Sequence, residues 1–217
     1  GRELALELDI GPGRAVMSYG LRNFPDGEIF TSPDASRNEY ALLEMQNDEI
    51  INRYNTENSE LQLWEAAGTI ALVGIDFDSE GSLWSLCSGA EKLLAKKTSS
   101  GDWSSYSLGG SASGVDCRDL FVDSYNQKWI LFRHTNSNPN YIAVYDETYP
   151  PGDQVRLLRS ETGVGNIPGS NVFSIAEDQD GEIWISRLYR PLERFDPRTE
   201  QSYSYTSNQN ALRNDNI

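Results

Sequence analysis

Acidic side chains at alternating positions form one group in the sequence that could do chemistry. Asp76, Asp78 and Glu80 stand at positions one, three and five of a calcium-binding loop, and a glycine follows at position six. Position twelve of such a loop carries a bidentate Glu, and Cys87 stands there instead. We therefore interpret the three carboxylates as turn residues, keep calcium as the alternative, and expect no other metal or cofactor.

Residue types suited to nucleophilic or acid–base catalysis are few. His134 is the only histidine, so any Ser-His or Cys-His pair would have to use it, and it lies in an apparent loop. The 33 acidic residues allow many carboxylate pairs of the kind that hydrolyse glycosides, but one sequence does not give their separation in space. We expect no enzyme, and a polysaccharide lyase or hydrolase is kept as an alternative.

These side chains need elements to hold them, and the sequence repeats one such element. A short apolar run ends at an Asp, a tight turn follows, and a second strand carries a Trp six positions after the Asp. Asp and Gly in the turn tolerate the left-handed backbone that hairpins require. The residues of this signature are Asp78, Gly81 and Trp84, then Asp123 and Trp129, then Asp178, Gly181 and Trp184.

A further copy of the signature, with Phe30 in the place of Trp, precedes these three. The four aromatic residues are separated by 54, 45 and 55 positions, a period typical of propeller blades. We predict an all-β fold, a β-propeller of about four to five four-stranded antiparallel blades. It would be a single domain or propeller fragment over 1–217, with a ring that is either closed by residues 3–10 or incomplete. Blade signatures are expected near 15–32, 71–87, 117–132 and 172–187.

The expected strands follow one plan in each blade. A leading strand at 3–10 precedes the first blade, which has a hairpin of 15–21 and 29–32, a third strand at 40–45 and an outer pair at 49–54 and 61–64. The later blades have strands at 71–77, 82–87, 92–97 and 102–106, then 117–122, 128–132, 141–146 and 154–158, then 172–177, 182–185, 192–195 and 202–205.

The two cysteines, Cys87 and Cys117, leave two structures open. Cys87 lies three residues after Trp84, and Cys117 begins the next repeat. Adjacent blades would bring the thiols together in a disulfide, which would stabilise the fold by about 3 kcal/mol. The interpretation that we favour is a pair of buried thiols that pack as small hydrophobic groups.

Composition and charge exclude several function classes. The net charge is −15, from 33 acidic and 18 basic residues, so we expect no nucleic-acid partner and no binding to anionic lipid surfaces. No apolar run approaches the roughly 18 residues that a membrane helix needs, and we expect no membrane span. The first residues show no basic leader followed by an apolar segment, so no signal peptide is expected within this sequence.

Several segments resemble known propeller repeats. The two-component-regulator propeller repeat of periplasmic Bacteroidetes sensors is similar to L-R-S-E-T-G-V-G-N-I-P-G-S-N-V-F-S-I-A-E-D-Q-D-G-E-I-W-I and to L-E-R-F-D-P-R-T-E-Q-S-Y-S-Y. The PorZ-type propeller family of type IX secretion is similar, in order, to G-P-G-R-A-V-M-S-Y-G-L, Y-N-T-E-N-S-E-L, V-G-I-D-F-D-S-E-G-S-L-W, G-D-W-S-S-Y and R-D-L-F-V-D-S-Y-N-Q-K-W-I. The I-W-I-S-R segment departs from that family, because Arg187 stands where a small turn residue is usual.

The resemblance implies an exported protein of the cell envelope, in the periplasm or at the outer-membrane surface. It implies non-enzymatic binding or scaffolding in a cell-surface secretion and attachment complex, with secretion-complex proteins or envelope lipopolysaccharide or another glycan as partners. A periplasmic saccharide-sensing propeller of a hybrid two-component regulator is the alternative. The matching motifs are structural, so the resemblance carries over no binding residue.

Ligand-binding candidates are therefore chosen by residue type and position. The signature tryptophans are expected to pack between blades, because they recur on second strands. Aromatic residues in or near loops are candidates for contacting a sugar, and arginines would make a locally basic mouth for an anionic ligand. The candidates are Trp103, Tyr141, Tyr149, Tyr189, Arg133, Arg187 and Arg190.

Overall fold

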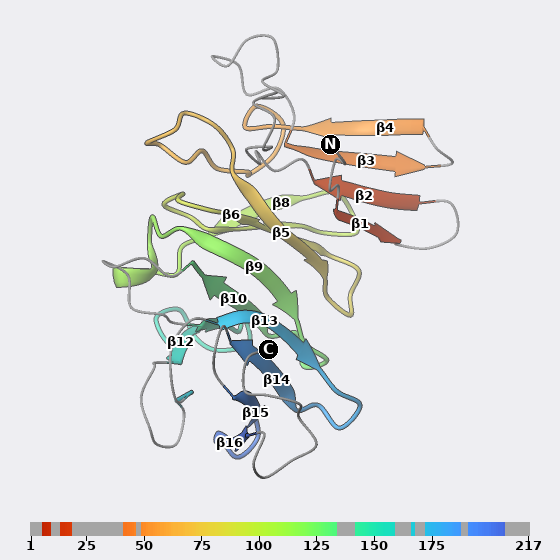
Figure 1. The fold of residues 1–217 in the computed structure, drawn as a ribbon. Helices are drawn as coiled ribbons and strands as arrows, with labels where there is room; N and C mark the ends of the chain where they lie inside the picture. Colours follow the sequence, from red (N-terminus) through yellow and green to blue (C-terminus); the bar gives the residue numbers. More distant parts are fainter. Residues whose placement is uncertain are drawn as a thin grey trace, which may run out of the picture. The chain divides into compact units, whose positions relative to one another are not determined.

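Four antiparallel sheets of four strands each make up the described part of the chain (Figure 1). The computed structural model describes residues 6–9, 14–18, 41–46, 49–133, 142–158, 166–167, 172–187 and 191–206. Within these ranges the secondary structure is β-strand, apart from one short 3-10 turn, η1 (Gly110–Ala112). No helix in the described ranges has the length and apolar character to cross a membrane.

Each sheet is built from strands in the order in which they follow one another in the sequence. Such meanders need only short connections between neighbouring antiparallel strands, and they are the unit of propeller blades. The first sheet contains β1 (Leu6–Asp9), β2 (Arg14–Ser18), β3 (Leu42–Gln46) and β4 (Glu49–Tyr54). The second contains β5 (Leu72–Phe77), β6 (Leu83–Cys87), β7 (Leu94–Lys97) and β8 (Trp103–Tyr106). The third contains β9 (Cys117–Val122), β10 (Lys128–Phe132), β11 (Ile142–Tyr145) and β12 (Val155–Leu158), and the fourth β13 (Val172–Glu177), β14 (Ile183–Arg187), β15 (Leu192–Asp196) and β16 (Gln201–Tyr205).

The chain divides into two compact units, Gly1–Cys117 and Arg118–Ile217. The first unit holds the first and second sheets, and the second unit holds the third and fourth. The prediction of one domain over 1–217 stays a prediction. The predicted strands of the second, third and fourth blades are confirmed, each within a few residues of its expected bounds.

The first sheet differs from its prediction. Its opening hairpin is β1 paired with β2, with Leu6 opposite Ser18 and Asp9 opposite Ala15. The leading strand therefore belongs to this sheet and does not complete the last one. The predicted hairpin of 15–21 and 29–32 is wrong, because β2 pairs with β1 on one side and with β3 on the other. Phe30 lies outside the described residues. The predicted strand at 61–64 is also wrong, since the only pairing there is an isolated bridge from Trp64 to Thr69.

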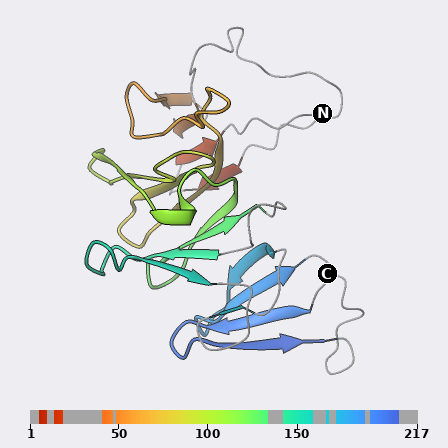
Figure 2. The same cartoon turned by 90° about the vertical axis from the view of Figure 1, so that its left-hand side faces the viewer.

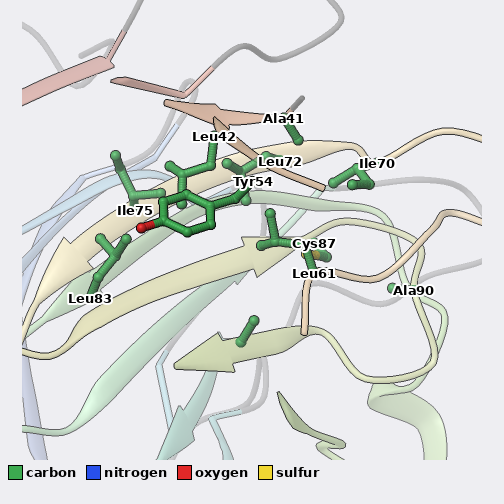
Figure 3. Close-up of a cluster of buried hydrophobic side chains, with 11 residues drawn as sticks. Ala41, Leu42, Tyr54, Leu61, Ile70, Leu72, Ile75, Leu83, Cys87 and Ala90 are labelled. Atoms are coloured by element: carbon green, nitrogen blue, oxygen red, sulfur yellow. The ribbon is translucent and has the colours of Figure 1, made fainter. Parts of the chain in front are cut away.

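In the first unit, the core lies around the ring of Tyr54 at the end of β4. Figure 3 shows this ring beside Leu42, Leu72 and Ile75, all of which are buried. Its hydroxyl donates a hydrogen bond of 2.7 Å to the carboxylate of buried Glu44, so the polar end of the ring is satisfied inside the core. Apolar packing between the first two sheets thus accommodates one internal polar contact.

In the second unit, the core lies between the third and fourth sheets, whose strands are seen side by side in Figure 2. Trp129 on β10 is fully buried and meets the ring of Phe195 on β15 edge-to-face, at 5.9 Å between centroids. Ile183 and Ile185 on β14 are also fully buried. Inward residues two apart along a strand thus fill the space between sheets.

Candidate functional site

The signature Asp and Trp form a clasp that explains their fixed interval of six. The indole N–H of Trp84 donates to Asp78 at 2.9 Å, and that of Trp129 donates to Asp123 at 2.8 Å. The same bond joins Trp184 to a third Asp at 2.7 Å. The second oxygen of each carboxylate accepts two backbone N–H groups of the turn, at 2.8–3.1 Å. The clasp therefore locks each inner hairpin at its turn.

The turn inside each clasp needs a left-handed residue. Gly81 and Gly181 supply it with φ of 75° and 77°, and Asn126 takes the same place in the third sheet with φ of 62°. Gly and Asn are the residues that adopt this conformation at least cost. The sequence prediction of hairpin turns with Gly81 and Gly181 is thereby confirmed.

The clasp also occupies Asp78, the middle one of the three carboxylates that resembled a calcium loop. Both oxygens of Asp78 accept hydrogen bonds, and Lys96 lies 3.7 Å from one of them. Burial raises the pKa of Asp78, but the bonds from Trp84 and Ser82 outweigh it, so the pKa lies below its ordinary value. Within the described residues, no group of three or more His, Cys, Asp and Glu side chains could hold a metal ion. Turn residues are the interpretation that this geometry supports.

The two cysteines are free, buried thiols in this structure. Burial raises the pKa of Cys87 to about 11, and burial together with Asp116 and Cys87 raises that of Cys117. Because the reactive form of a thiol is the thiolate, neither cysteine is a nucleophile at neutral pH. The packing interpretation fits these thiols, and the disulfide is not formed.

The structure assigns a different role to one of the predicted ligand residues. Arg187, at the end of β14, is 2% exposed and forms a hydrogen-bonded ion pair with Glu193, which is 1% exposed. Ser204 donates a second hydrogen bond to the same carboxylate. Arg187 is therefore a buried structural residue, and the prediction that it lines a basic mouth is wrong.

The other predicted ligand residues are scattered. Trp103 is half-buried, and its ring meets that of Tyr54 in an edge-to-face contact at 5.3 Å between centroids. Arg133 follows β10 and is exposed, and Tyr149 is 54% exposed in the turn between β11 and β12. Their roles in ligand binding stay predictions. The remaining candidates, Tyr141, Tyr189 and Arg190, lie outside the described residues, as does His134.

Sequence reasoning missed a pair of side chains on the inner strands of the second unit. The guanidinium of Arg118, on β9, lies over the ring of Phe173, on β13, at 4.2 Å from the ring centroid. Arg118 is exposed and Phe173 is 51% exposed, so the pair faces solvent. Figure 1 shows β13 beside the β9–β10 hairpin, which is what brings the two side chains together. An exposed cation stacked on a ring is a preformed contact for a ligand.

A β-bulge turns Phe173 outward. Val172 pairs with Arg187 and Ser174 pairs with Ser186, so Phe173 has no partner on β14. Bulges of this kind re-aim a side chain, and here both Phe173 and Ser174 are exposed. One residue of the inner strand of the fourth sheet, Phe173, is therefore exposed at the surface and is not paired within the sheet.

The repeat numbering reveals why these two residues meet. Arg118 stands five residues before Asp123, and Phe173 stands five residues before Asp178, so they hold the same position in successive blades. Val73 holds it in the second sheet and is likewise the extra residue of a bulge. The Asp, the turn residue and the Trp are repeated, whereas this position varies between an aliphatic, a cationic and an aromatic side chain. Counting back from the signature Asp is the signal that could have found the pair.

Two hydroxyl groups belong to neighbouring positions of the fourth sheet, because Ser174 directly follows Phe173. Ser174 on β13 and Ser186 on β14 share a hydrogen bond of 2.7 Å at the surface. We call Arg118, Phe173, Ser174 and Ser186 the inner-strand patch. It offers a cation, an apolar ring face and hydroxyls that both donate and accept, all on strands whose turns are clasped.

These clasped four-stranded meanders define the chain as a β-propeller protein, and the predicted fold class is confirmed. The family described as "Two component regulator propeller" matches residues 166–186. This match confirms the resemblance to that repeat over the segment that leads into the fourth sheet. No curated protein matches the chain.

Solved structures show the same fold at low sequence identity. The extracellular domain of the putative hybrid two component system BT3049 from B. thetaiotaomicron matches 97% of this chain at a TM-score of 0.59 and 14% identity. A catalytically inactive virginiamycin B lyase from Staphylococcus aureus with quinupristin matches 94% at a TM-score of 0.58 and 16% identity. PorZ, a surface component of the type-IX secretion system of Porphyromonas gingivalis, matches 95% at a TM-score of 0.49 and 12% identity, which does not confirm the PorZ-type family.

The chain spans only part of these proteins. The match covers 24% of the BT3049 domain, 56% of the lyase and 34% of PorZ. At these identities the likeness concerns the fold, and the activities of the larger proteins do not transfer with it.

Proposed function

We propose that this chain is a non-enzymatic binding propeller of an exported protein of the cell envelope, and that it holds a glycan or a protein partner on one face of its blades. The observation that carries the proposal is the exposed Arg118–Phe173 pair, built from equivalent positions of two inner strands. Side chains held in place on rigid elements lose little conformational freedom when a ligand binds, which favours a binding role for this pair.

The chemistry of the inner-strand patch favours binding over catalysis. Its side chains are a guanidinium, a phenyl ring and two hydroxyls, and an arginine stays protonated at all physiological pH values. The Ser174 and Ser186 hydroxyls bond to each other, an arrangement that supplies no base to activate either of them. A ligand held there would be recognised and released unchanged.

A second candidate function has specific support. The match of residues 166–186 to the two-component-regulator propeller, with the likeness to the BT3049 extracellular domain, supports a role in a hybrid two-component regulator, for which we propose a saccharide as the ligand. The same patch would serve as its ligand site. The two candidates differ in what the ligand does, since a sensor changes the output of an attached kinase and a scaffold does not.

The test measures binding and turnover in the same samples. The purified chain is titrated with fractionated envelope glycans and with isolated envelope proteins by calorimetry, and each glycan is then examined by mass spectrometry for shortening. We expect saturable binding of one fraction, weakened by Phe173→Ala, with every ligand recovered intact. The matched control is Tyr203→Ala, because Tyr203 is an exposed, arginine-stacked ring on β16 of the same sheet. Shortened glycan, or equal effects of the two variants, would contradict the proposal.

A further inference from the structure

We propose that the inner-strand patch recognises a hexuronic acid, a sugar ring that carries a carboxylate, within an acidic polysaccharide. This inference rests on the binding function proposed above and names the class of ligand. It follows from three features of the patch: an oriented guanidinium, a half-exposed ring and a pair of surface hydroxyls.

The guanidinium of Arg118 is oriented but retains donors. Contact with the ring of Phe173 at 4.2 Å restricts its movement, and one Nη1–H donates to the carbonyl of Val172 at 3.4 Å. An arginine has five N–H donors in a planar fork, so this bond leaves an edge able to hold a carboxylate through two parallel hydrogen bonds. Holding the side chain in place beforehand lowers the entropy cost of binding.

The ring and the hydroxyls suit the rest of a sugar. Phe173 is 51% exposed, so part of its ring is available to the apolar C–H face of a pyranose. The Ser174–Ser186 pair beside it can exchange its mutual hydrogen bond for bonds to sugar hydroxyls, because each serine both donates and accepts. An acidic peptide would use the guanidinium but would leave the hydroxyl pair without an evident role.

The net charge of the chain restricts which anions fit. At −15, the chain repels densely charged chains such as polyphosphates at long range. A polyuronate carries one carboxylate per sugar, and its contact with Arg118 acts within hydrogen-bond distance. Salt screens the long-range repulsion over about 8 Å at physiological ionic strength, while the direct contact is less affected. Affinity for a uronate should therefore hold or rise from low to physiological salt, unlike binding driven by a basic surface.

The experiment compares a galacturonic acid trisaccharide with its fully methyl-esterified form, which keeps the shape and removes the charge. Calorimetry of the whole chain should show tighter binding of the acid. Arg118→Gln should weaken binding of the acid roughly tenfold to a hundredfold, the range for one hydrogen-bonded charged contact, and leave the ester unchanged. Phe173→Leu should weaken both ligands. Arg198→Gln is the matched control, because Arg198 is an exposed arginine in the turn after β15 and should change neither.

Several outcomes separate this inference from the proposed function. Equal affinity for acid and ester, or no effect of Arg118→Gln on the acid, would overturn the inference. Binding of a glutamate-rich peptide as tightly as the trisaccharide, with the same dependence on Arg118, would also overturn it, because the site would then read a carboxylate on a protein. If the neutral sugar or an envelope protein binds at the patch instead, the inference fails and the binding function stands. If the trisaccharide is shortened, the proposed function fails.

Discussion

The third and fourth sheets each contain an Asp–Trp clasp at the turn of the inner hairpin, but the Trp is buried to different extents in the two sheets. Trp129 donates to Asp123 at 2.8 Å and Trp184 donates to Asp178 at 2.7 Å, so the two clasps have the same geometry. Yet Trp129 is 0% exposed, with the ring of Phe195 packed on it, whereas Trp184 is only half-buried. The comparison shows that the clasp is a local structure of the hairpin, which forms both where the indole is fully buried and where it is half-buried.

The face of the fourth sheet around Trp184 is polar and aromatic. Tyr205 lies beside the indole at 5.2 Å between centroids. Arg194 covers Tyr203 at 4.7 Å and forms an ion pair with Glu182 at 2.9 Å. In the third sheet, Val144 stands opposite Trp129 in the place that Arg194 has opposite Trp184. Cation–aromatic contacts thus replace aliphatic packing on the more exposed sheet.

The last residues of β10 and β14 show the same difference: the third sheet has an apolar side chain there and the fourth sheet a charged one. Nine residues after the signature Asp, the third sheet has Phe132 at 3% exposure, and the fourth has Arg187 at 2%. A phenyl ring needs only apolar neighbours, but a buried guanidinium needs a counterion, which Glu193 supplies. Two equivalent and equally buried positions therefore hold an apolar side chain in one sheet and a charged side chain in the other. Substitution at each position tests how it is stabilised.

The largest expected difference is in the two tryptophans. Trp129→Ala should lower the free energy of unfolding by about 3–5 kcal/mol, as for a large side chain removed from a core. Trp184→Ala should cost roughly 1–3 kcal/mol, because less apolar surface leaves water when that residue folds. Urea unfolding followed by circular dichroism measures both, since the lost indole does not affect that signal strongly.

Phenylalanine at the same two positions separates the contribution of the indole hydrogen bond from the contribution of ring burial. Trp129→Phe and Trp184→Phe each remove the indole N–H and keep an aromatic ring, so both should lose a similar amount, about 1–2 kcal/mol for a hydrogen bond to a carboxylate. Equal losses for the two alanine variants would contradict the comparison and would mean that Trp184 is covered in solution.

The clasp is also where sequence reasoning succeeded most fully. Its hairpin is specified by a few neighbouring residues: an Asp whose carboxylate caps the turn, a left-handed Gly or Asn, and a Trp within reach. Such local chemistry is visible in the order of residues, and it predicted the strands of three sheets. The first sheet lacks an Asp and Trp at this interval, and there the observed β1–β2 pairing differs from the predicted hairpin of 15–21 and 29–32.

A second test addresses the buried ion pair of the fourth sheet. Glu193→Gln should lower the free energy of unfolding by roughly 3 kcal/mol, because it removes the negative charge of the buried carboxylate that pairs with the buried guanidinium of Arg187. The double variant Arg187→Phe, Glu193→Leu replaces the ion pair with apolar side chains, as at Phe132 in the third sheet. Its free energy of unfolding should be within about 1–2 kcal/mol of that of the wild type. A single variant as stable as the wild type would show that the pair is solvated.

The same pair marks the limit of prediction from sequence. Arg187 follows a strand in a segment that departs from related repeats, and those facts suggested a ligand residue. Whether a charged side chain faces solvent or a counterion depends on Glu193 of the next strand and Ser204 of the strand after it. The inner-strand patch was missed for the related reason that Arg118 and Phe173 are 55 residues apart and meet only because adjacent blades align.

The smallest expected effect is a difference in pH dependence between the two clasps. Burial raises the pKa of Asp123 above its ordinary value of 3.8, even though Trp129 and two turn amides donate to it. The bond from Trp184, with those from the turn amides, holds the pKa of Asp178 below 3.8. An aspartate with a raised folded pKa opposes folding while ionised, and this cost is relieved as the pH falls through the folded pKa. One with a lowered folded pKa adds stability above 3.8, which is lost as the pH falls through its folded pKa.

Asparagine variants measure these two terms separately. The stability difference between wild type and Asp123→Asn should move in favour of wild type as the pH falls from neutral toward 3.8. The difference for Asp178→Asn should stay constant over that range and turn against wild type only below 3.8, where the Asp178 carboxylate takes up a proton and its clasp weakens. Urea unfolding at a series of pH values gives both curves. Parallel curves for the two variants would mean that the third-sheet clasp is as accessible to water as the fourth-sheet clasp, contrary to the burial of Trp129.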